Sequence, residues 1–241
     1  MVELSGRQED ALQRYREEVL RWNASINLIS RIDTRELLES LVTECVAAYN
    51  TLVTAVLPAV AESAPDRPTS CHYADLGSGA GFPGLVWHLL SEASGGMDES
   101  AAGAILVEPR EKRAWFLEQT AALMDLRDVR VGMDQWGART GLRGAGLPAT
   151  VTGLISLKAL RLTDDEVIAG WRRYRGGAPV DTLVICRFQG PDGTMDTGLR
   201  ERLRLPPESP PESQGAPWAR FFPIDTLPEP RHLLVSGYPS I

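Results

Sequence analysis

One short stretch constrains the fold of this chain more than any other. Residues 73–84 read Tyr-Ala-Asp-Leu-Gly-Ser-Gly-Ala-Gly-Phe-Pro-Gly, and a helical apolar pattern follows from Leu85. The order predicts a strand that ends near Asp75, a tight turn from Gly77 to Gly81, and a helix. Glycine permits positive φ and close approach of the backbone to a ligand. A helix N-terminus adds free N–H groups. We therefore expect a ligand-binding turn in an α/β fold.

The spacing of the glycines narrows the class of ligand. It is G-x-G-x-G, whereas the dinucleotide fingerprint is G-x-G-x-x-G; a shifted match to that fingerprint runs from Gly79 to Gly84. A P-loop is excluded, because no Gly-Lys-Ser/Thr follows. The next apolar run ends in Glu108, where an acid can accept hydrogen bonds from a ribose diol. An NAD-type protein and a turn that binds nothing are the alternatives to be weighed.

Strands and helices alternate along the rest of the chain. We expect strands at 73–76, 104–108, 129–131, 151–157 and 180–187, and a closing β-hairpin at 221–224 and 232–235. This alternation predicts an α/β, doubly wound and mainly parallel sheet. Apolar periodicity predicts two earlier helices, over 5–31 and 34–56. The domains are therefore expected to be a helical extension over 1–65 and a ligand-binding domain over 70–241. Residues 189–215, rich in Pro, Gly and Glu, are expected to be an exposed excursion.

Charge and composition limit which partners this protein can bind and in which cellular compartment it works. The chain has 241 residues, a formal net charge of −7 and only two lysines, so a broad basic footprint for nucleic acid is absent. The three cysteines form no CxxC pair and the three histidines are scattered, which argues against a metal site or a disulfide framework and indicates a cytoplasmic protein. No apolar run is long enough to predict a membrane helix, and the N-terminus lacks a signal-peptide pattern.

The turn, followed by an acid after the second strand, resembles class I S-adenosylmethionine (SAM) methyltransferases. More narrowly, the chain resembles the bacterial 16S rRNA guanine-N7 methyltransferases, also called glucose-inhibited division protein B. The matching stretches are Trp22-Asn23, Asn27-Leu28, residues 75–84, Lys112-Arg113 with Phe116-Leu117, and residues 231–235. The resemblance implies SAM as cofactor, S-adenosylhomocysteine as product, and 16S rRNA or the 30S subunit as partner.

The resemblance also implies which residues hold the cofactor. The backbone of the turn would surround the amino-acid end of SAM, with Asp75 below it, and Glu108 would take the ribose hydroxyls. Phe82 could line the pocket or belong to the core. Residues after the third strand would flank the adenine, although an exposed acid and a core tryptophan are equally good interpretations. The full set is Asp75, Gly77, Ser78, Gly79, Ala80, Gly81, Phe82, Glu108, Pro109, Asp134, Gln135 and Trp136.

The acceptor side departs from the family pattern. Leu41, Glu44 and Cys45 stand where the family has a His and an Asp-Ser pair, and Ser156-Leu-Lys158 replaces Ser-Arg-Ala. Ser156 and Lys158 are the acceptor-side candidates, and no catalytic residue is identified. Attack by a ring nitrogen lone pair needs no general base, because positioning supplies the rate. The alternative to rRNA is a divergent relative that N-methylates a small heterocyclic molecule.

Overall fold

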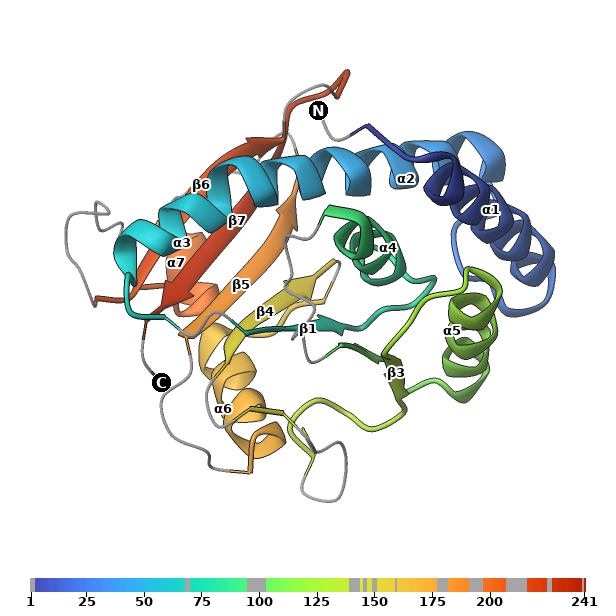
Figure 1. Cartoon of the computed structure of the whole chain (residues 1–241). Coiled ribbons are helices and arrows are strands. Elements are labelled where there is room, and N and C mark those ends of the chain that lie inside the picture. Colours follow the sequence, from blue (N-terminus) through green and yellow to red (C-terminus); the bar gives the residue numbers. More distant parts are fainter. Residues whose placement is uncertain are drawn as a thin grey trace.

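A seven-stranded sheet forms the centre of the computed structural model (Figure 1). Its order is β3-β2-β1-β4-β5-β7-β6, and only β7 runs antiparallel to its neighbours. The strands are β1 (Cys71–Leu76), β2 (Ala104–Val107), β3 (Val129–Gly132), β4 (Thr152–Leu157), β5 (Thr182–Gln189), β6 (Trp218–Ile224) and β7 (Arg231–Tyr238). The sheet confirms the predicted doubly wound, mainly parallel fold and its C-terminal hairpin.

The structure describes residues 3–67, 70–94, 103–138, 144, 147–148, 151–158, 160–176, 182–190, 197–206, 216–224, 227–239 and 241. Most of the glycine- and arginine-rich stretch 137–148 and most of the excursion at 189–215 lie outside these ranges. Within the excursion, α7 (Thr197–Leu203) is a helix whose described residues are exposed or half-buried.

Helices cover both faces of the sheet, which explains why its central strands read as continuous apolar runs. One face packs against α6 (Asp164–Tyr174), whose Val167, Trp171 and Tyr174 join the apolar core on that side. The other face packs against α4 (Gly84–Ser94) and α5 (Glu111–Leu123). The glycine turn joins β1 to α4 at the carboxyl ends of the parallel strands, where ligands bind in such folds.

Three helical segments precede the sheet and share its core. They are α1 (Gly6–Ile26), α2 (Thr34–Thr51) and α3 (Leu57–Ser63), with the π-helical turn η1 (Leu52–Val56) joining the last two. A capping box at Ser5 starts α1 as the pattern indicates. The helix ends five residues before the predicted Arg31, because Asn27 adopts a left-handed conformation and the Asn23 side chain accepts a hydrogen bond from the Ile29 N–H.

The second predicted helix is longer than expected. Pro58 lies in the first turn of α3, where a missing N–H costs nothing, so the helix continues to Ser63. Its N-cap is Asp33 rather than Thr34. By length and hydropathy alone, the stretch Thr34–Ser63 could cross a membrane. Half of its most apolar 18-residue window is buried, however, and its apolar face belongs to the core shared with α4, as expected for the core helix of a globular protein.

Candidate active site

Three glycines give the turn after β1 a shape that other residues do not tolerate. Gly77, Gly79 and Gly81 have φ of 73°, 55° and 96°. A Cβ at Gly81 would lie 2.6 Å from Leu85 Cδ1. The N–H groups of Gly77 and Ser78 both donate to the Val107 carbonyl, at 2.8 and 3.1 Å, which fixes the turn to the end of β2. The result is a cradle of bare backbone at the carboxyl end of the sheet.

Glu108 closes this cradle from the neighbouring strand. Its carboxylate is buried; Oε2 accepts a hydrogen bond from the Gly79 N–H and Oε1 accepts one from the Arg110 N–H, each at 3.0 Å. Pro109, the next residue, is exposed. The structure thus brings together the two features that the sequence placed 29 positions apart.

Asp75 lies beneath the turn in a chain of buried hydroxyl groups. Ser156 Oγ donates to Asp75 Oδ1 at 2.5 Å and lies 2.8 Å from the Tyr73 hydroxyl. Within the described part of the chain, Asp75 Oδ2 is buried without a hydrogen-bond partner. Burial raises the pKa of Asp75 from 3.8 to about 6, although the hydrogen bond from Ser156 opposes this shift. Ser156, an acceptor-side candidate, is fully buried and bonded to Asp75.

Two further residues of the turn connect it to the N-terminal helices. Phe82 is buried and packs edge-on against Tyr15 of α1, with ring centroids 5.3 Å apart. The Tyr15 hydroxyl donates to the Ala80 carbonyl at 2.9 Å. Phe82 therefore occupies the core position that was one of its two interpretations, and Ala80 contributes its carbonyl to a structural contact.

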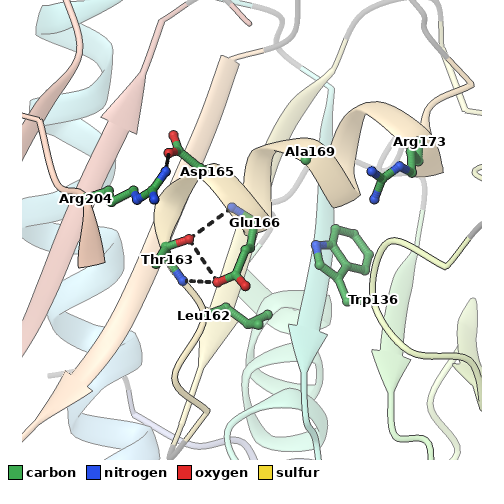
Figure 2. A pocket seen from close by; sticks show the side chains of 8 residues that line it. All are labelled: Trp136, Leu162, Thr163, Asp165, Glu166, Ala169, Arg173 and Arg204. Carbon is green, nitrogen blue, oxygen red and sulfur yellow. Dashed lines mark hydrogen bonds and ion pairs between the residues drawn. The ribbon is translucent and has the colours of Figure 1, made fainter. Parts of the chain in front are cut away.

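The residues after β3 lie against α6. Trp136 Nε1 donates to the Val167 carbonyl at 3.1 Å, Asp134 is half-buried and Gln135 is exposed. Trp136 also forms one wall of a cavity of about 410 Å³ (Figure 2). The other lining residues are Leu162, Thr163, Asp165, Glu166, Ala169, Arg173 and Arg204. Trp136 thus packs against α6 and also forms part of the cavity wall.

Lys158 meets residues from two other elements at the carboxyl ends of β4 and β5. Its ammonium group forms an ion pair with Glu44 of α2 and lies 4.3 Å from the centroid of the Phe188 ring. Farther along the same loop, Leu160 packs over Gly77. The sequence marked both Glu44 and Lys158 as departures from the family pattern but gave no sign that they pair.

A second buried ion pair escaped prediction. Arg187 Nη2 lies 2.6 Å from Asp164 Oδ1, and the Tyr238 hydroxyl donates to Asp164 Oδ2 at 2.5 Å. Burial, followed by the nearby Asp164 charge, raises the pKa of Tyr238 well above its ordinary value. Asp164 is the first residue of α6, where an acid also compensates the helix dipole. The available signal was Arg187 itself, an arginine at the end of an otherwise apolar strand.

No cluster of three or more metal-binding side chains occurs among the residues that the structure describes. His72 Nε2 lies 2.8 Å from the Tyr174 hydroxyl, and His88 Nε2 lies 2.6 Å from the Arg127 carbonyl. Both histidines therefore take part in packing contacts.

A family model described as rRNA small subunit methyltransferase G matches residues 8–135, slightly more than half of the chain. A ribosomal RNA small subunit methyltransferase G from Roseiflexus castenholzii is 33% identical over 135 residues, which cover 54% of this chain and 46% of the relative. One from Myxococcus xanthus is 34% identical over 119 residues, 49% of this chain and 44% of the relative. The chain thus spans about half the length of the curated relatives it matches.

Among solved structures, an rRNA methylase from Streptococcus thermophilus superposes with a TM-score of 0.43 at 13% identity, covering 76% of this chain and 96% of that one. The matched segment 8–135 contains the glycine turn and Glu108, whereas Ser156 and Lys158 lie beyond it.

Proposed function

The chain belongs to the rRNA small subunit methyltransferase G family, and from this premise we propose that it transfers a methyl group from SAM to a guanine N7 of 16S rRNA in the small ribosomal subunit. The observation that carries the proposal is the contact between Glu108 and Gly79. It places an acid and a bare glycine backbone side by side, at the point where parallel strands end. Both features lie within the segment that matches the family.

The residues present fit the cofactor. The backbone of Gly77, Ser78 and Gly81 would surround its amino-acid end, since the positive φ at Gly77 and Gly81 leaves bare backbone in the turn at the carboxyl ends of the strands. Glu108 would take the ribose hydroxyls. An ionised carboxylate has about four acceptor positions, and the two N–H groups on Glu108 use only two of them. When bound, SAM supplies an activated methyl group on a sulfonium.

The proposed reaction requires positioning rather than proton transfer. The guanine N7 lone pair forms the new N–C bond as the C–S bond breaks, so no proton has to leave first. Holding the two reactants in line can supply roughly 7–11 kcal/mol of the barrier. Asp75 and Ser156 then act as buried supports of the turn, and neither is required as a general base.

An exposed basic cluster beside the cofactor cradle supports an RNA substrate. Arg110 and Lys112 are exposed at the start of α5, next to Glu108. Arg113 donates to the Asn27 carbonyl at 2.9 Å and so joins α5 to the end of α1. Contacts of such cations with phosphate position an RNA without reading its sequence. An rRNA substrate also agrees with the cytoplasmic location expected from the cysteines.

The test is transfer of labelled methyl from SAM, in parallel, to unmodified 30S subunits and to a panel of purines and related heterocycles. We expect label in 16S rRNA alone, with a yield that falls steeply as salt rises, because phosphate contacts are screened. Label only in a small heterocycle would contradict the proposal. Displacement of SAM by NAD at equal concentration would place the chain among dinucleotide-binding proteins instead.

A further inference from the structure

The ion pair between Glu44 and Lys158 lies directly after the carboxyl end of β4, the strand next to β1 and its glycine turn. Lys158 lies two residues after Ser156, which is bonded to Asp75 under the turn. It lies two residues before Leu160, which packs over Gly77. The segment that carries Lys158 is therefore held against the cradle on both sides. Glu44 reaches the same point from α2.

A stabilising role does not explain the ion pair between Glu44 and Lys158 well. The side chains of Lys158 and Glu44 are only 17% and 12% exposed. Removing two charges from water costs several kcal/mol per ion, and apolar replacements of similar volume are often neutral or stabilising. Phe188 lies beside the ammonium group and offers an apolar surface at the same place. The retained carboxylate and ammonium place a hydrogen-bond acceptor and a hydrogen-bond donor side by side.

We propose that this pair recognises the Watson–Crick edge of the acceptor guanine. The Glu44 carboxylate would accept hydrogen bonds from N1–H and the 2-amino group, while the Lys158 ammonium would donate to O6. O6 and N1–H are adjacent on the base, as the ammonium and carboxylate are adjacent in the protein, so the ion pair can stay intact. N7 lies on the other edge of the base and remains free to face the methyl donor.

The same arrangement rejects adenine, which presents an amino group where guanine has O6 and a lone pair where guanine has N1–H. A donor would then face the ammonium group and a lone pair would face the carboxylate. This inference rests on the proposed function, because it concerns the acceptor of that reaction.

The experiment uses the full chain and small subunits reconstituted with 16S rRNA that carries either guanosine or inosine at the methylated position. Inosine keeps O6, N1–H and N7 but lacks the 2-amino group. A hydrogen bond to a charged group contributes about 1.5–3 kcal/mol. We therefore expect kcat/KM of the wild-type chain to be about 10- to 100-fold lower for inosine.

Substitutions of Glu44 test whether this side chain causes the preference for guanosine over inosine. Glu44→Gln is expected to lower kcat/KM for guanosine about 10- to 100-fold and to reduce the guanosine-to-inosine ratio to below about 3, while the calorimetric affinity for SAM stays unchanged. Glu36→Gln, at an exposed position on the same helix, is the matched control and should keep both rates. The double variant Glu44→Gln/Lys158→Met removes both charges together, so the measurement survives if Glu44→Gln alone fails to fold.

Each outcome decides the matter. A wild-type chain that methylates inosine and guanosine equally, or a Glu44→Gln variant that keeps the wild-type ratio, would overturn the role of Glu44 while leaving the rRNA methyltransferase intact. Absence of methyl transfer to any RNA would remove the proposed function, and this inference with it.

Discussion

At the scale of single residues, Gly81 is where the cradle has the least room. Its φ of 96° and the Leu85 side chain both oppose a Cβ. We expect Gly81→Ala to cost about 2 kcal/mol of unfolding free energy and to weaken SAM binding. Gly176→Ala is the control, because Gly176 has a φ of 67° with nothing within 4 Å of its Cβ position. Urea unfolding that gives equal losses for both variants would show that crowding at Gly81 is unimportant.

Glu108 is expected to contribute to affinity through its charge. Replacing it with alanine removes the acceptor of the ribose hydroxyls and frees the Gly79 N–H. We expect Glu108→Ala to raise the Kd for SAM about 10- to 100-fold in calorimetry. Glu111→Ala, at an exposed position in the first turn of α5, should leave the Kd unchanged. An unchanged affinity in Glu108→Ala would remove the ribose role.

Asp75 gives the protein a pH dependence of defined sign. The unfolded chain loses this proton near pH 3.8, whereas the folded protein holds it to about pH 6. Between these values the folded state binds more protons, so the unfolding free energy falls as pH rises, by about 3 kcal/mol in total. Asp75→Asn should remove this fall in urea unfolding measured from pH 4 to pH 7. Profiles that run parallel for wild type, Asp75→Asn and the exposed control Asp66→Asn would contradict the assignment.

At the scale of elements, the loop after β3 and helix α6 fit closely. A Cβ at Gly170 would lie 2.0 Å from Trp136 Nε1. Alanine usually stabilises a helix by about 1 kcal/mol relative to glycine, yet here we expect Gly170→Ala to destabilise the protein. In a Trp136→Ala background the same change should become stabilising. Thermal unfolding of both single variants and the double variant measures this coupling. Additive effects would mean that the two residues are not in contact.

The sequence allowed most elements to be located because their signals are local. Apolar periodicity located the first helix, and in the structure capping boxes at Ser5 and Thr163 begin α1 and α6. The glycine spacing identified the turn and its positive φ values, and the apolar runs located the strands. Where the sequence failed on elements, the cause was also local: Pro58 suggests a helix end, but it lies in the first turn of α3, where it is tolerated.

The acceptor side could not be predicted, because its contacts join distant parts of the chain. Glu44 and Lys158 are 114 positions apart, and no periodicity relates a helix of the N-terminal extension to the end of β4. The packing of Trp136 against α6 depends in the same way on Gly170, a glycine of that helix. The glycine turn and the acid after the second strand were predictable, whereas contacts between elements required the fold.

At the scale of the whole molecule, the predicted boundary between residues 65 and 70 crosses a shared core. Trp22 of α1 packs against Phe116 of α5 at 5.9 Å between ring centroids, and Tyr49 of α2 packs against Trp87 of α4 at 6.5 Å. Trp87 Nε1 also donates to the Cys45 carbonyl at 2.9 Å. The helical extension therefore covers buried apolar surface of α4 and α5.

Removal of the extension should expose that surface. We expect a fragment of residues 70–241 to aggregate and to lack the cooperative thermal transition of the full chain, since Trp87 would lose its contact with Tyr49 and Phe116 its contact with Trp22. Calorimetry of the fragment beside the full chain checks this. A soluble fragment with a cooperative transition would instead establish residues 70–241 as an independent domain.

The central claim concerns where the methyl group goes. The most direct measurement is nucleoside mass spectrometry of 16S rRNA from unmodified small subunits after incubation with SAM and the purified chain. The account predicts one 7-methylguanosine per rRNA with the wild-type chain and a strongly reduced yield with Glu108→Ala at limiting SAM. A methyl group on any other atom, or rRNA that stays unmodified while the chain binds SAM, would contradict it.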